Sequence, residues 1–161
     1  MNPTIQQLLQ LFAPIDKLHQ SGNLDEAERQ LDRLYANMPE LTSRISSGMD
    51  IMFNGFRVAA ATYNSLGRSN LQLAQNGNRA RLTNAANCFQ MAQEMAQLPM
   101  DVEYGILTIA LWGAGHVAYL QGNRDASRNY LKECISVDLG RTPNEAATKA
   151  QQDAQQLLQK L

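Results

Sequence analysis

Apolar residues recur at helical spacing along most of this chain, and the same dipeptide separates the runs three times. The dipeptide is Gly-Asn, at Gly22-Asn23, Gly77-Asn78 and Gly122-Asn123. Glycine is favoured just past a helix end because it tolerates positive φ. Asparagine is a favoured N-cap because its side-chain oxygen accepts a hydrogen bond from an unpaired helix N–H. Each dipeptide therefore predicts a helical hairpin, and the chain contains three of them.

The remaining pattern predicts about seven or eight helices and no sheet. Pro14 interrupts the first helical run and should kink or break it. Between residues 42 and 57 the helical pattern is weakest, because Gly48 and Gly55 interrupt the apolar positions. Thr142-Pro143 is expected to begin the last helix, as N-cap and first helical residue. Other helices are expected at Val58–Ala74, Arg79–Gln97 (ended by Leu98-Pro99), Asp101–Leu120 and Asn123–Val137.

Within the hairpins, small residues stand at fixed spacing from large ones, which allows two helices to pack closely. The second helices read Ala27-x3-Leu31-x2-Leu34, Ala85-x3-Phe89-x2-Ala92 and Ser127-x3-Leu131-x2-Cys134, and two first helices carry Tyr63-x2-Leu66-Gly67 and Leu111-x2-Ala114-Gly115. This register resembles the tetratricopeptide repeat. The hairpins are spaced more widely than that repeat's period of about 34 residues, which indicates an insertion near Arg44–Arg57. A generic helical bundle is the structural alternative.

The resemblance implies an all-α fold, a tetratricopeptide-like solenoid of about three antiparallel helical hairpins plus a C-terminal capping helix. Residues 1–161 would form this single domain. In that family the first helix of each hairpin lines a concave groove that binds a partner protein. Carried over by register, the predicted partner-binding residues are Phe12, Asp16, His19, Asn64, Arg68, Ile109, Trp112, His116 and Tyr119. Trp112 and Tyr119 have a second interpretation, as ordinary core residues.

Charge and composition exclude several partner classes. The formal net charge is −1, with scattered lysines and arginines, so no nucleic-acid partner is expected. No apolar stretch is long enough for a membrane span or a signal peptide, so we expect no membrane insertion and a cytoplasmic location. The two cysteines, Cys88 and Cys134, lie inside helical patterns and are interpreted as reduced, buried thiols.

The sequence offers little chemistry. His19 and His116 have no partner at metal-ligand spacing, so no metal site is predicted. The acidic pairs Asp25/Glu26 and Asp101/Glu103 stand at helix starts, where the helix dipole explains them without catalysis. We therefore expect no enzyme and no cofactor.

The sequence thus predicts a non-enzymatic protein-interaction module, an adaptor or small chaperone. Its partner would be an apolar-leaning peptide or helix held in the concave groove, because Arg68 is the only evident cation there. A self-associating structural subunit, possibly a homo-oligomer, is the first alternative. A helical regulator that binds a small ligand is the second.

Overall fold

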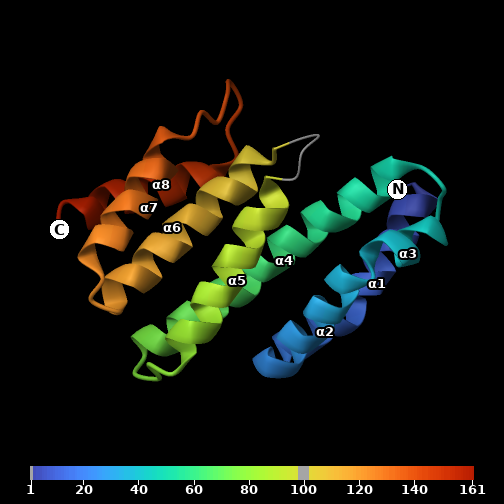
Figure 1. The fold of residues 1–161 in the computed structure, drawn as a ribbon, viewed down its shortest axis with the longest axis horizontal. Helices are drawn as coiled ribbons and strands as arrows, with labels where there is room; N and C mark the ends of the chain where they lie inside the picture. Colours follow the sequence, from blue (N-terminus) through green and yellow to red (C-terminus); the bar gives the residue numbers. More distant parts are fainter. Residues whose placement is uncertain (1, 98–101) are drawn as a thin grey trace.

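The computed structural model of the chain describes residues 2–97 and 102–161 (Figure 1). This part of the chain forms eight helices and no strand, in agreement with the sequence prediction. Pro99 and Asp101, expected at a helix end and a helix start, lie outside the described residues. The helices are α1 (Pro3–Gln20), α2 (Leu24–Ala36), α3 (Met38–Ser43), α4 (Met49–Gln75), α5 (Arg81–Ala96), α6 (Tyr104–Leu120), α7 (Arg124–Ser136) and α8 (Glu145–Leu158).

The three Gly-Asn dipeptides form the three predicted hairpin turns. Gly22, Gly77 and Gly122 have φ of 81°, 113° and 80°, as the sequence predicted for residues just past a helix end. In each turn the N–H after the glycine donates to a carbonyl in the last turn of the preceding helix, at 2.8–3.0 Å. The asparagines behave less uniformly. Asn123 caps α7 by accepting from the Ala126 N–H, whereas the Asn23 side chain makes no cap hydrogen bond.

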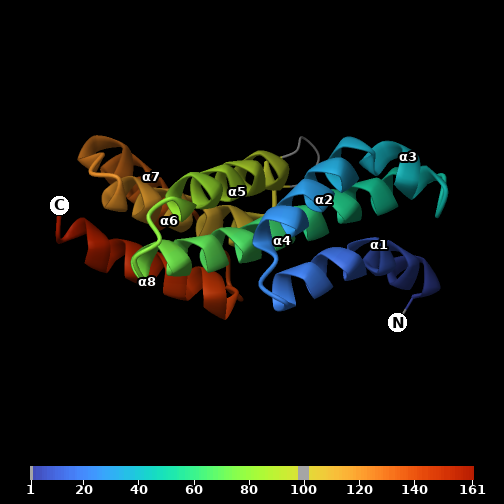
Figure 2. The same cartoon turned by 90° about the horizontal axis from the view of Figure 1, so that it is seen from below.

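The helices pack in chain order as successive antiparallel pairs. α1 packs on α2, α4 on α5 and α6 on α7, and α4 and α6 also contact each other. The last helix, α8, packs on both α6 and α7. In Figure 2, α2, α5 and α7 lie along one side of this array and α1 and α8 along the opposite side, with α4 and α6 between them. The two chain ends lie at opposite ends of the molecule (Figure 1).

Helix α4 begins earlier than the sequence predicted. We expected a helix from Val58, but the structure has one helix of 27 residues starting at Met49. Gly55 does not interrupt it. A Cβ at this position would lie 2.6 Å from the sulfur of Met38, so the glycine allows α3 to pack closely against α4.

Two other helix boundaries differ from those expected. Pro14 does not break the first helix, because α1 continues through it. The last helix is capped by Asn144 rather than Thr142, because the Asn144 side chain accepts from the Ala146 and Ala147 N–H groups. Helix α8 therefore starts at Glu145.

The core is divided into clusters along the array. One cluster joins α1, α2 and α4, with Phe12, Leu31 and Tyr63 almost fully buried. A second surrounds Phe89 where α5 meets α4 and α6. A third lies under α8, where Leu157 packs with Leu111 and Leu131. The terminal helix thus covers part of the last hairpin.

Candidate functional site

The structure separates the nine predicted groove residues into three groups. Phe12 and Asn64 were expected to line a groove but are only 1% and 2% exposed. Phe12 belongs to the core between α1 and its neighbours, and the Asn64 amide donates to the Ile106 carbonyl at 3.0 Å. Neither side chain is accessible to a partner, so their assignment to the groove was wrong.

The two residues from the end of α1 form a second group. Asp16 is exposed, and His19 is partly buried with its Nε2 atom 2.7 Å from the Ser69 hydroxyl of α4. This contact fastens α1 to α4. Neither residue lines the two hollows that the remaining five border.

The remaining five line a continuous surface on α4, α6 and α8, which we call the α6–α8 face. It contains two adjoining hollows of about 230 Å³ and about 200 Å³. Trp112 and Asp153 border both hollows. The residues that line this face are Arg68, Ile109, Trp112, His116, Tyr119, Ala146, Lys149, Ala150, Asp153, Gln156, Leu157 and Lys160.

The aromatic side chains of α6 form a row along this face. The ring centroids of Trp112 and His116 are 5.6 Å apart and those of His116 and Tyr119 are 6.5 Å apart, in edge-to-face contact. All three side chains are partly buried, because α8 covers one side of the row. Trp112 and Tyr119 therefore contribute to the core and to the surface together, so neither of the two sequence interpretations applies alone.

The surroundings of His116 disfavour a positive charge on its ring. Burial lowers the pKa of His116, and the nearby charge of Lys160 lowers it further. The Gln75 amide nitrogen lies 3.1 Å from His116 Nε2, while Nδ1 is buried and has no hydrogen-bond partner among the described residues. A positive charge on the partly buried His116 ring would be poorly solvated. The positive charge of the face is therefore carried by other residues.

Helix α8 contributes charged side chains to the α6–α8 face. Their position on this face was not predicted from the sequence. Lys149 pairs with Asp153 at 3.2 Å. Arg68 and Lys160 make no ion pair within the described residues. The face is thus a partly apolar surface, and two of the cations beside Trp112 have no ion-pair partner in the part of the chain that the structure describes.

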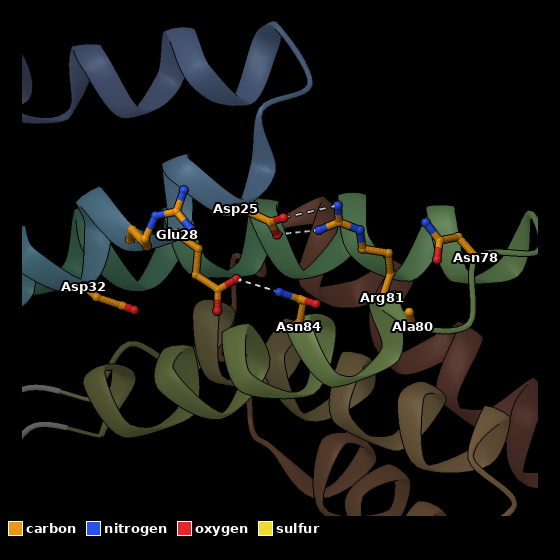
Figure 3. A pocket seen from close by; sticks show the side chains of 8 residues that line it. Asp25, Glu28, Asp32, Asn78, Ala80, Arg81 and Asn84 are labelled. Carbon is orange, nitrogen blue, oxygen red and sulfur yellow. Dashed lines mark hydrogen bonds and ion pairs between the residues drawn. The ribbon is translucent and has the colours of Figure 1, made fainter.

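A second, larger depression lies between α2 and α5 and was not predicted. We call it the α2–α5 trough (Figure 3). Its two connected parts enclose about 570 Å³ and about 370 Å³ and share Glu28 and Asp32. The wider part is lined by Asp25, Glu28, Arg29, Asp32, Asn78, Ala80, Arg81 and Asn84, and the narrower part by Glu28, Asp32, Tyr35, Asn87, Gln90, Met91 and Glu94.

Polar contacts cross the trough at its wider part. As Figure 3 shows, Arg81 of α5 reaches Asp25 of α2, with 2.6 Å between Nη1 and Oδ1. The Asn84 amide donates to Glu28 at 3.3 Å, also from α5 to α2. Below the trough, the buried Tyr63 hydroxyl donates a short hydrogen bond to Asp32. The first two contacts orient Asp25 and Glu28 toward α5, whereas the third joins Asp32 to α4.

The carboxylates of the trough repel one another. The pKa of Glu28 is raised, first by burial and then by the negative charges of Asp32 and Asp25, although Asn84 and Arg81 oppose the shift. Burial also raises the pKa of the Cys88 thiol beneath, and Glu28 and Asp32 add to that effect. The lining of the trough contains four carboxylates and two arginines, and the trough lies on the opposite side of the array from α8.

The sequence did contain a signal for the trough. Asp25, Glu28 and Asp32 stand at positions i, i+3 and i+7 of α2, and this spacing places them on one helix face. We assigned Asp25 only to the helix dipole. The sequence could not show that α5 would present Asn84 and Glu94 opposite this face.

The described residues hold no group of three or more histidines, cysteines or acidic residues placed to bind a metal ion. Cys88 and Cys134 are free thiols, both fully buried. Burial raises the pKa of Cys134 to about 12. Neither cysteine is placed to act as a nucleophile.

Among the described helices, none has the length and apolarity to cross a membrane. Comparison of the chain with protein-family models, with curated proteins and with solved structures finds no match.

Proposed function

We propose that this chain is a non-enzymatic, cytoplasmic protein-interaction module, an adaptor or small chaperone, that holds an apolar-leaning segment of a partner protein on the α6–α8 face. The ordered pairing of α1 with α2, α4 with α5 and α6 with α7 supports a tetratricopeptide-like repeat, with α8 as its capping helix. Repeat arrays of this kind offer extended surfaces to other proteins.

The position of Trp112 carries the proposal. This side chain borders both hollows of the face and is only partly buried. Tryptophan and tyrosine are enriched among the residues that dominate binding energy at interfaces. The hollows on either side, about 230 Å³ and about 200 Å³, suit single side chains of a partner. They are smaller than the roughly 300–1,000 Å³ that small-molecule sites usually have, which disfavours the small-ligand alternative at this face.

Trp112→Ala tests the proposal, with Tyr104→Ala as its matched control. Tyr104 is an aromatic residue of the same helix, 52% exposed and outside both hollows. Tagged wild type and both variants are used to capture partners from the native cell, and mass spectrometry identifies them. One protein should be captured by wild type and by Tyr104→Ala, and lost with Trp112→Ala.

Thermal unfolding of the same proteins separates binding from folding. If Trp112 is an interface anchor, its truncation to alanine should weaken binding by about 2 kcal/mol or more while the variant stays folded. A partner retained equally by all three proteins would remove the face from the binding site. Self-association lost with Trp112→Ala would favour the structural-subunit alternative instead.

A further inference from the structure

The two ends of the α2–α5 trough differ in how their charges are balanced. At the wide end both cations are already paired, because Arg81 contacts Asp25 and Arg29 contacts Glu26, each at 2.6 Å. The narrow part is lined by Glu28, Asp32 and Glu94 and by no lysine or arginine. None of these three carboxylates has an ion pair within the described residues.

The narrow part also has an apolar wall. Tyr35 and Met91 line the same hollow of about 370 Å³ as the three carboxylates. A wall of this kind suits the methylene stem of a long basic side chain, whose charged end then reaches the acidic groups. A guanidinium can also lie against an aromatic ring, which an ammonium does less well.

Arg81 shows that a guanidinium fits this trough. Its Nη1 and Nη2 atoms lie 2.6 Å and 3.5 Å from the two Asp25 carboxylate oxygens (Figure 3). The geometry repeats along α2, because Glu28 and Asp32 follow Asp25 on the same helix face. Glu28 accepts one hydrogen bond from Asn84 and Asp32 accepts one from Tyr63, so each carboxylate keeps acceptor sites for a second guanidinium.

We propose that the α2–α5 trough binds an arginine-bearing segment of a partner protein, with the guanidinium among Glu28, Asp32 and Glu94 and its stem against Tyr35 and Met91. Charge complementarity identifies the occupant. Such a cation relieves the repulsion between Glu28 and Asp32, and a charge-assisted, forked hydrogen bond gives arginine an advantage over lysine. This site is independent of the α6–α8 face, so either can exist without the other.

Selection from a displayed library of random peptides tests the site without a known partner. Four folded proteins serve as bait: wild type, the double variant Glu28→Gln/Glu94→Gln, the charge control Glu133→Gln on α7, and Trp112→Ala. Thermal unfolding verifies each fold. We expect wild type, Glu133→Gln and Trp112→Ala to enrich arginine-containing peptides, and the double variant to enrich none.

An enriched peptide then gives the affinity. Its dissociation constant should rise roughly tenfold or more with Glu28→Gln/Glu94→Gln, which removes two of the three carboxylate charges, and also when citrulline replaces its arginine, which removes the guanidinium charge. Selection without arginine enrichment, or with equal enrichment by the double variant, overturns the proposal. Loss of the arginine peptides with Trp112→Ala assigns them to the other face and also overturns it. Sedimentation tests the same proteins for self-association. If self-association occurs and only the double variant abolishes it, the trough binds a second copy of the chain, and the proposal is overturned.

Discussion

Gly113 on α6 and the ring of Phe89 on α5 are in such close contact that a Cβ atom on residue 113 would overlap the ring. The same ring lies against Gly67 of α4, where a Cβ would approach it to 2.9 Å. Phe89 is thus packed between two glycines and joins the second hairpin to the third. The close approach of α4, α5 and α6 depends on the absence of side chains at these two positions.

Gly113→Ala should destabilise the protein although alanine favours helices. Alanine contributes up to about 1 kcal/mol through helix propensity, but overpacking a core costs roughly 1–3 kcal/mol. Gly105→Ala on the same helix is the control, because its Cβ would meet no atom closer than 3.6 Å. Urea unfolding should show a loss for Gly113→Ala and none for Gly105→Ala. Equal stability of both variants would contradict the packing described for Phe89.

Gln151→Ala should loosen α8 from the end of α7. The Gln151 amide nitrogen donates to the carbonyls of Cys134, Ile135 and Val137 at 3.0, 3.4 and 2.8 Å. Its removal leaves carbonyls at the end of α7 without their donor, at a cost on the order of 1–3 kcal/mol. The neighbouring exposed Gln152, changed to alanine, should cost little. Thermal unfolding compares the two, and similar melting temperatures would show that Gln151 does not anchor α8.

Deletion of residues 142–161, which removes α8, should lower the stability of the protein more than Gln151→Ala does. Without α8, Leu111 and Leu131 would lose the cover that Leu157 gives them. We expect aggregation or a large fall in the free energy of unfolding. A truncated chain that stays soluble and as stable as the parent would show that α8 is dispensable for the core.

The two cysteines should resist alkylation in the folded protein. Burial raises the pKa of Cys134 to about 12 and also raises the pKa of Cys88, so little reactive thiolate exists at neutral pH. Labelling with iodoacetamide, followed by mass spectrometry, should be slow before denaturation and fast after it. Rapid labelling of either residue in the native state would argue against its place in the core.

The stability of the protein should fall in mild acid partly through His116. Its pKa is lowered below 6.5 by burial and by Lys160, so the unfolded chain binds the proton more readily. The stabilisation is therefore complete above the unfolded pKa of about 6.5 and is lost as the pH falls through that value toward the folded pKa. Urea unfolding between about pH 7.5 and about pH 5.5 should show a smaller loss for His116→Gln than for wild type. Glu28 contributes to the pH dependence of stability with the opposite sign to His116. Because Glu28 titrates in both proteins, its contribution cancels when the two losses are compared. Identical losses would remove His116 as the cause.

The sequence predicted local features well because local chemistry determines them. Gly22, Gly77 and Gly122 need positive φ at a helix end, and that requirement is visible in the chain itself. The pairing of small with large residues was also readable, as in Gly115 against Leu131. The continuous helix through Gly55 was missed, because its close contact with Met38 comes from another element.

The candidate sites depended on packing between distant elements. Register alone could not show that Phe12 and Asn64 would be buried. Nor could it show that α8 and the residues just after it would place Lys149 and Lys160 beside Trp112. The α2–α5 trough needs both α2 and α5, which are separated by the whole of α4. The set of residues that share one side of a helix was therefore predictable from the sequence. The elements that lie opposite that side were not.

The central claim is that a partner segment occupies the α6–α8 face beside Trp112, and Trp112 is the only tryptophan of the chain. Incorporation of 5-fluorotryptophan therefore gives a single ¹⁹F NMR signal that no partner protein can obscure. Addition of the partner captured by wild type should shift or broaden this signal, and Trp112 should become less accessible to a soluble paramagnetic agent. A partner that binds the labelled protein while the ¹⁹F signal and its accessibility stay unchanged would show that binding takes place elsewhere.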